Sequence, residues 1–86
     1  MKKITMFMMA TCPHCKAALQ WMDKLYSENG EYKSIEIEMI DERVHPDIAE
    51  KYDYYYVPTY YVDGEKLHEG TASLENVRRV FDAACS

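Results

Sequence analysis

A pair of cysteines at the boundary between two differently patterned segments constrains this chain most. Lys3 to Met9 is apolar on both of its faces, which is typical of a strand covered on both sides. From Pro13 to about Asn29, apolar residues recur at helical spacing, and Asn29-Gly30 is a suitable helix stop. Cys12-Pro13-His14-Cys15 lies where the strand gives way to the helix. Because proline is tolerated in a first helical turn, the pair is expected to begin the helix.

The next segments predict a second strand and a second helix. Tyr32 to Met39 alternates Ile35, Ile37 and Met39 with polar residues, which indicates an outermost strand with one wet face. Two strands separated by a helix form a right-handed unit with parallel strands. The second helix is expected to begin around Pro46 and to run through Tyr52.

A hairpin and a last helix complete the chain. Thr59 to Val62 and Lys66 to Glu69 flank Asp63-Gly64, which is a strong signal for a two-residue turn. Ser73 can cap the last helix. The apolar face of that helix contains Leu74, Val77, Phe81 and Ala84. The predicted order is therefore β-α-β-α-β-β-α, an α/β class.

Size and charge restrict the partners of the chain. Its 86 residues form one domain, residues 1–86, and a hydrophobic content of 48% suffices for a small core. The net charge is −5 and the basic residues are scattered, so no nucleic acid partner is expected. No segment approaches the roughly 20 apolar residues that cross a membrane. A leader cleaved near Ala10 would remove the strand that presents Cys12, so we expect a cytoplasmic protein.

In a reducing compartment, paired cysteines at this spacing are catalytic or bind metal more often than they form structural bridges. Only a thiolate attacks a disulfide, and the free N–H groups at a helix N-terminus lower the pKa of a cysteine placed there. Pro13 has no N–H and fixes the turn. Cys15 lies one turn later on the same side of the helix. We therefore expect Cys12 to be the nucleophile and Cys15 to resolve the mixed disulfide.

Metal binding is the alternative, because zinc sites use the same spacing. Such a site normally needs two further ligands in a recognisable pair, and His45, His68 and Cys85 are isolated. We therefore expect no metal within one chain. A metal or iron–sulfur protein in which two protomers pool cysteines, Cys12 among them, remains the second hypothesis. A third is an interaction module without turnover, against which the intact pair argues.

The chain resembles a small thioredoxin-fold dithiol oxidoreductase over essentially its whole length. The resemblance is carried by the predicted order of helices and strands, by Cys12-Pro13-His14-Cys15 after the first strand and by Val57-Pro58 before the third. The segment from Val57 to Gly70 is more similar to thioredoxins. The short length and the Cys-Pro-x-Cys form are more similar to glutaredoxins. The resemblance implies the thioredoxin fold, a four-stranded mixed sheet flanked by helices. It also implies that Pro58 is cis beside the cysteines and that the backbone of Val57 pairs with bound substrate.

The same resemblance implies an enzyme of cell redox homeostasis and electron transport. It would act as a monomer without a bound cofactor and reduce protein or low-molecular-weight disulfides. The electron donor would be glutathione or a flavoprotein reductase. The amides near Thr71 to Ser73 could hold a carboxylate, so Gly70 and Thr71 are candidate substrate-binding residues. Thioredoxins usually bury an acidic residue in the first strand, which this chain lacks, and Glu42 is expected on a solvated loop.

Residues around the pair are candidates for tuning it. Cys-Pro-His-Cys is similar to the motif of the periplasmic dithiol oxidases, and His14 beside Cys12 would stabilise the thiolate and raise the reduction potential. The alternative is that His14 is merely exposed in the turn. Lys16 would help the Cys12 thiolate or would only be solvated. Cys85 is either a redox-sensing thiol or a packed residue near the end of a helix.

Tyrosines gather around Pro58, and they allow two interpretations. They would form an aromatic wall for a substrate, or they would pack and cover the sheet. Tyr56, next to Val57, is the best candidate for substrate contact. The group consists of Tyr52, Tyr54, Tyr55, Tyr56, Tyr60 and Tyr61.

Overall fold

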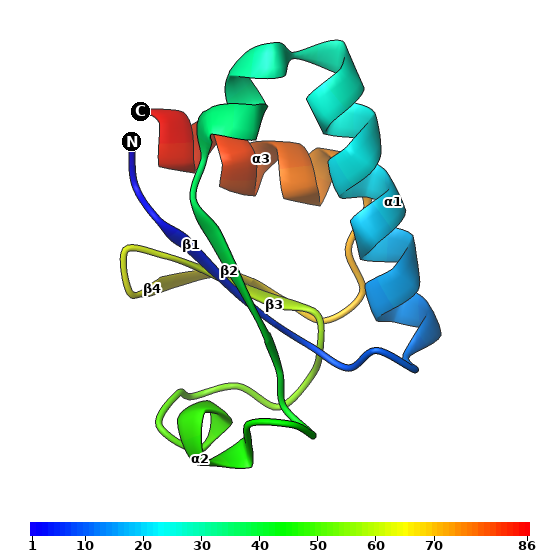
Figure 1. The fold of residues 1–86 in the computed structure, drawn as a ribbon, viewed down its shortest axis with the longest axis vertical. Helices are drawn as coiled ribbons and strands as arrows, with labels where there is room; N and C mark the ends of the chain where they lie inside the picture. The colour runs from blue at the N-terminus through cyan, green and yellow to red at the C-terminus, as the bar shows by residue number, and fades with distance from the viewer.

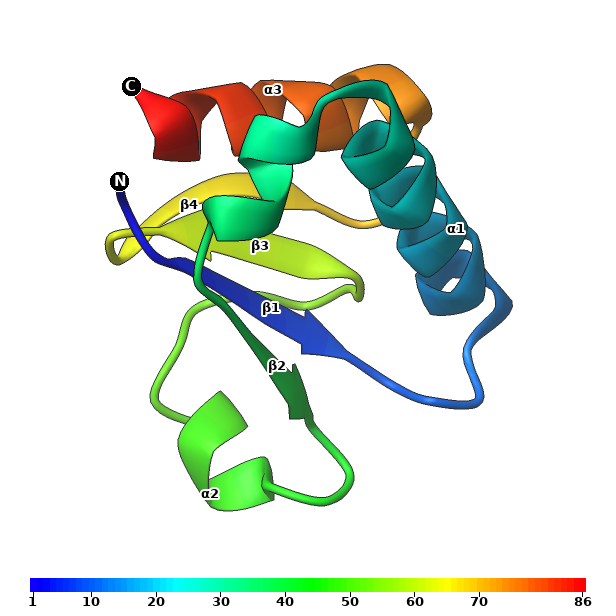
Figure 2. The ribbon, with the colours of Figure 1, turned by 45° about the horizontal axis from the view of Figure 1, so that its top comes forward.

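The computed structural model describes residues 1–86 and builds them around a four-stranded sheet of order β2-β1-β3-β4. The first two strands in the chain, β1 and β2, are parallel, and the remaining neighbours are antiparallel. Helices α1 and α3 cover one face of this sheet and α2 lies on the other (Figure 1, Figure 2). The elements are β1 (Ile4–Met8), α1 (Pro13–Glu28), the 3₁₀ helix η1 (Gly30–Ser34), β2 (Ile37–Asp41), α2 (Pro46–Ala49), β3 (Thr59–Val62), β4 (Glu65–Glu69) and α3 (Leu74–Cys85). The predicted mixed sheet and order of elements are confirmed.

Strand β1 is central and its two faces enter different cores. Ile4 and Met6 are fully buried in a cluster with α1 and α3. Phe7 faces the opposite side, where it packs with Ile40 and Tyr61. The prediction of a strand covered on both sides is confirmed. This central strand carries the chain directly to the cysteine pair.

The hairpin and the last helix begin as their sequence signals indicate. Asp63 and Gly64 have φ angles of 48° and 84°, the left-handed values that a tight two-residue hairpin turn requires. Lys3 N–H donates to Asp63 Oδ1 at 3.0 Å, which ties the turn to the start of the chain. Ser73 caps α3 and forms a reciprocal pair of hydrogen bonds with Asn76.

The predicted strand from Tyr32 to Met39 is wrong at its first half. Residues 30–34 form η1, in which Asn29 Oδ1 accepts a hydrogen bond from Glu31 N–H at 3.0 Å. Tyr32 is buried against Phe81, and its hydroxyl donates to Asp82. A 3₁₀ turn that presents one buried tyrosine therefore replaces the expected extended chain.

Two further expectations on this side of the sheet need correction. Met39 was expected on the covered face, but it is 51% exposed and joins neither core, whereas Ile40 is buried. The edge position of β2 was predicted correctly. Helix α2 ends at Ala49 rather than continuing through Tyr52. The chain turns back there, because the Tyr52 ring packs on Phe7 with 4.6 Å between ring centroids.

Candidate active site

Cys12 lies at the N-terminus of α1, as the sequence predicts. It is the N-cap residue with extended backbone angles, and Pro13 is the first helical residue. Cys12 is partly exposed, Cys15 is fully buried, and both are free thiols. The backbone of Cys12 is held on both sides: its N–H donates to Met9 O at 3.1 Å and its carbonyl accepts from Lys16 N–H at 3.0 Å. One sulfur is therefore presented to solvent and the other to the interior.

The helix N-terminus acts on the Cys12 sulfur electrostatically. The backbone amide of Cys15 lowers the pKa of the Cys12 thiol most, and the amide of His14 adds to this effect. The Cys12 side chain forms no capping hydrogen bond of ordinary length, so these amides act on its sulfur at longer range. The Cys15 thiol also favours the Cys12 thiolate by hydrogen bonding. The nucleophilic form of Cys12 is thus stabilised mainly by backbone.

The environment of Cys15 has the opposite effect. Burial raises the pKa of its thiol to about 11, and the adjacent Cys12 charge contributes to the increase. Met9 N–H donates to Cys15 Sγ at 3.4 Å, which orients the sulfur at the base of the turn. Cys15 is therefore a protonated thiol beside a partner that ionises more easily.

The cis-proline loop meets the active-site turn through the β4–α3 connection. The Val57-Pro58 peptide bond is cis, as the resemblance implied, and Pro58 is buried. Gly70 N–H donates to Pro58 O at 2.9 Å, and the next residue, Thr71, places its Oγ1 3.3 Å from His14 Nδ1. The structure therefore brings four of the expected site residues together with the cysteine pair.

The remaining candidate site residues differ in how exposed they are and in what they contact. Tyr56 is 71% exposed, and its Cβ lies 3.9 Å from where a side chain on Gly70 would begin. Lys16 is exposed and forms no side-chain ion pair or hydrogen bond. Cys85 ends α3, packed against the main core, and burial raises the pKa of its thiol. Among the tyrosines, Tyr55 is 86% exposed. Those that pack within the fold are Tyr52, Tyr54, Tyr60 and Tyr61.

Two adjacent acidic residues at the end of β2, Asp41 and Glu42, belong to the site although the sequence predicted a solvated edge and loop. Asp41 Oδ2 accepts from Ala10 N–H at 3.1 Å, which ties the loop before Cys12 to the end of the parallel strand. Glu42 is half-buried and accepts a hydrogen bond from the Tyr54 hydroxyl at 2.7 Å. Its negative charge raises the pKa of both Cys12 and Cys15. The predicted topology contained a signal for this placement: parallel neighbouring strands end at the same edge of a sheet, so the end of β2 lies beside the end of β1.

The remaining surface offers one pocket near the turn. It has a volume of about 340 Å³ and contains Met9, Glu42 and Tyr54 in its wall. No group of three or more His, Cys, Asp and Glu side chains is arranged to hold a metal ion. None of the helices is long and apolar enough to pass through a membrane.

A cysteine pair at the start of the first helix, linked through Thr71 and Gly70 to a cis-proline loop, in a β2-β1-β3-β4 sheet defines a thioredoxin-fold thiol oxidoreductase. The sequence matches the family described as the thioredoxin domain over residues 2–82. The chain belongs to this family. No curated protein matches it.

Solved structures agree on the fold. A malarial protein is similar with a TM-score of 0.73 and 19% identity, covering 99% of this chain and 98% of that one. The oxidised thioredoxin of Plasmodium falciparum has a TM-score of 0.74 and 16% identity, with 99% and 82% of the chains covered. Thioredoxin 1 of Thermosipho africanus has a TM-score of 0.60 and 20% identity, with 98% and 99% covered.

The pKa order of the three thiols predicts their order of alkylation. Because only the thiolate reacts, each unit by which a pKa is lowered gives about tenfold more reactive form at a pH below it. Iodoacetamide should therefore modify Cys12 at a lower pH than Cys85, and Cys15 should react last. Peptide mass mapping across pH 5 to 10 measures the midpoint of Cys12 and shows the order in which Cys85 and Cys15 follow. Equal midpoints for Cys12 and Cys85 would contradict the electrostatic role of the helix N-terminus.

Proposed function

We propose that this protein reduces disulfides of proteins or low-molecular-weight thiols through a Cys12–Cys15 dithiol–disulfide cycle. The observation that carries the proposal is the asymmetry of the pair: a partly exposed sulfur with a lowered pKa beside a buried thiol with a raised one. In the first step the Cys12 thiolate attacks one sulfur of the substrate. A Cys12–substrate bond forms, the substrate S–S bond breaks, and the first substrate thiolate leaves.

Cys15 completes the reaction. The mixed disulfide removes the negative charge of Cys12, which is one of the causes that keep the pKa of Cys15 high. The Cys15 thiol then gives its proton to the first substrate thiolate, which left in the first step, and the Cys15 sulfur attacks Cys12 Sγ. The internal disulfide forms, the second substrate thiolate leaves, and the dithiol has given up two electrons. Glutathione or a flavoprotein reductase would return them in a reducing, cytoplasmic setting.

Substrate contact is assigned to the cis-proline loop. The backbone N–H and C=O of Val57 have no partner within the chain, so both are available to a bound substrate. Tyr56 lies beside Gly70, which Thr71 follows in the chain, and Tyr56 is exposed. The N–H groups of Gly70 and Ser73 are already used by Pro58 and Asn76. A substrate carboxylate would therefore be received by the amides of Thr71 and Ala72.

The reduction potential of the pair tests this function. We expect a value between about −270 mV and about −120 mV, the range from thioredoxin to the strong dithiol oxidases. The protein is equilibrated in defined glutathione buffers, and mass spectrometry counts dithiol, internal disulfide and glutathione adduct. The adduct tests glutathione as a partner. A pair that never forms the internal disulfide overturns the proposal, and a coloured protein with stoichiometric iron would favour the metal-binding alternative.

A further inference from the structure

Strand β4 carries an ion pair that a regular strand would not allow. Side chains alternate between faces along a strand, so residues three apart normally point to opposite sides. In this sheet Tyr60 pairs with His68 and Tyr61 with Lys66, so the register shifts by one residue in between. This bulge lets Lys66 Nζ and Glu69 Oε1 meet at 2.7 Å. The two side chains are only 35% and 20% exposed.

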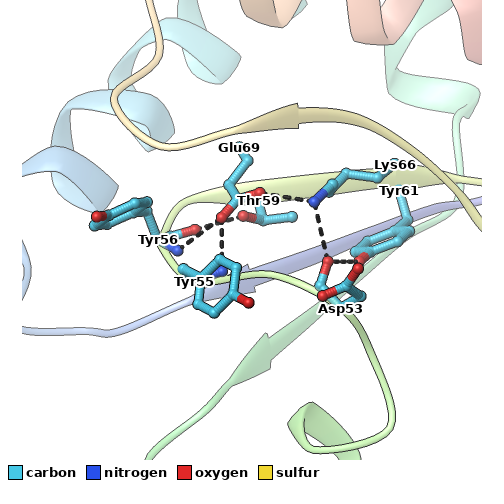
Figure 3. Close-up of polar contacts among 7 residues, drawn as sticks. All are labelled: Asp53, Tyr55, Tyr56, Thr59, Tyr61, Lys66 and Glu69. Atoms are coloured by element: carbon cyan, nitrogen blue, oxygen red, sulfur yellow. Dashed lines mark hydrogen bonds and ion pairs between the residues drawn. The ribbon is translucent and has the colours of Figure 1, made fainter.

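The pair holds the segment that leads to the cis proline at several points (Figure 3). Glu69 Oε2 accepts from the backbone N–H groups of Tyr55 and Tyr56 at 2.6 and 3.1 Å. Lys66 Nζ donates to Asp53 O at 3.0 Å. The same carbonyl accepts from the Tyr61 hydroxyl at 2.8 Å. At the other end of the segment, the Thr59 hydroxyl donates to Tyr56 O.

We propose that Glu69, supported by Lys66, is a positioning residue that fixes the 55–57 backbone for pairing with a polypeptide disulfide. The inference rests on the proposed function and names its substrate class. We call the Lys66–Glu69 pair, with its hydrogen bonds to this backbone segment, the clamp. Its hydrogen bonds stop at Tyr56, and the next residue, Val57, is the one whose backbone groups are free. Fixing two consecutive amides leaves Val57 little freedom to rotate away. In Figure 3 the rings of Tyr55 and Tyr56 point away from the Glu69 carboxylate, so the clamp holds backbone and leaves both rings available.

The nature of this contact selects a class of substrate. A polypeptide disulfide has backbone amides and carbonyls beside its cysteine, and these can pair with a fixed edge as an added strand does. A small aromatic disulfide has no such groups and needs only access to Cys12. Preorganising the edge reduces the ordering cost for the polypeptide alone. The clamp therefore sets the affinity for polypeptide substrates and leaves the chemistry of the thiols unchanged.

The clamp stays ionised over the working range of the enzyme. Hydrogen bonding from Lys66 lowers the pKa of Glu69 to about 2, and hydrogen bonding to Glu69 raises the pKa of Lys66. Neither group changes its charge between about pH 4 and 9. An effect of the clamp on substrate affinity should therefore be constant across the pH range in which Cys12 titrates, which separates it from an effect on the thiol.

Glu69→Ala and Glu69→Gln test the clamp against the matched control Glu65→Ala. Glu65 is on the same strand, is exposed and forms no side-chain hydrogen bond or ion pair. With insulin as the polypeptide disulfide, we expect Glu69→Ala to raise KM about three- to tenfold, the net effect of losing one typical hydrogen bond. Glu69→Gln retains one acceptor oxygen and should recover part of the loss. Turnover of 5,5′-dithiobis(2-nitrobenzoate) and the alkylation midpoint of Cys12 should stay at wild-type values in every variant.

Amide exchange provides a readout that does not depend on activity. The Tyr55 and Tyr56 amides should exchange faster in Glu69→Ala than in Glu65→Ala, while the amides of α1 stay protected. An unchanged KM for insulin in Glu69→Ala overturns the inference, as does an equal loss on both substrates. Should the wild-type protein reduce neither disulfide, the proposed function fails, and the exchange rates still decide whether the clamp holds its segment.

Discussion

Cys12→Ser is expected to reduce disulfide turnover to the uncatalysed rate. A serine hydroxyl does not ionise near neutral pH, so the lowered pKa that the first-turn amides provide has no thiol on which to act. Cys15, with a pKa of about 11 and no exposed surface, cannot replace it. Insulin reduction with a saturating reductant measures the loss. Retention of full activity would refute Cys12 as the nucleophile.

Cys15→Ser should give a different failure, because the first step survives. Cys12 still attacks, but the mixed disulfide has no neighbouring thiol to resolve it. Intact-mass spectrometry should show one equivalent of substrate attached to the protein and released by dithiothreitol. Cys85→Ser is the matched control, since Cys85 ends α3 and contacts neither active-site cysteine. It should cycle at the wild-type rate. A trapped adduct in Cys85→Ser, or none in Cys15→Ser, would contradict the assignment.

The sequence predicts the elements that carry strong local signals. The hairpin turn at Asp63-Gly64, the cap at Ser73 and the start of α1 at Pro13 each depend on residues that are adjacent in the chain. The location of Cys12 at the helix N-terminus follows from the last of these. Both cysteines could therefore be placed, and their roles predicted, before their burial was known.

The missed features depend on contacts between distant residues. Tyr32 alternates as a strand residue does, and only its partners Phe81 and Asp82 select a 3₁₀ turn instead. Glu42 enters the site because the ends of β1 and β2 adjoin. The Lys66–Glu69 pair requires a register shift that no local pattern announces. Local propensity is a weak guide where tertiary packing selects the conformation.

Phe81→Ala should produce a large loss of stability. Phe81 is fully buried on α3, and its ring lies 5.6 Å from that of Tyr26 on α1 and 5.3 Å from that of Tyr32 on η1. One side chain thus joins three elements. Removing a buried phenylalanine costs about 3–5 kcal/mol. Small domains lie towards the lower end of the roughly 5–15 kcal/mol that holds native proteins folded.

Urea denaturation followed by far-UV circular dichroism measures the free energy of unfolding of this variant. Arg79→Ala is the matched control, since Arg79 is on the same helix, is exposed and has no side-chain partner, so its effect should stay within about 0.5 kcal/mol. The cysteines are presented by α1, which packs on α3 through Tyr26 and Phe81. Activity should therefore fall with the folded fraction of the variant. The alkylation midpoint of Cys12 in the molecules that remain folded should stay unchanged. A loss below about 1 kcal/mol would show that the contacts between these three elements contribute little to the stability of the fold.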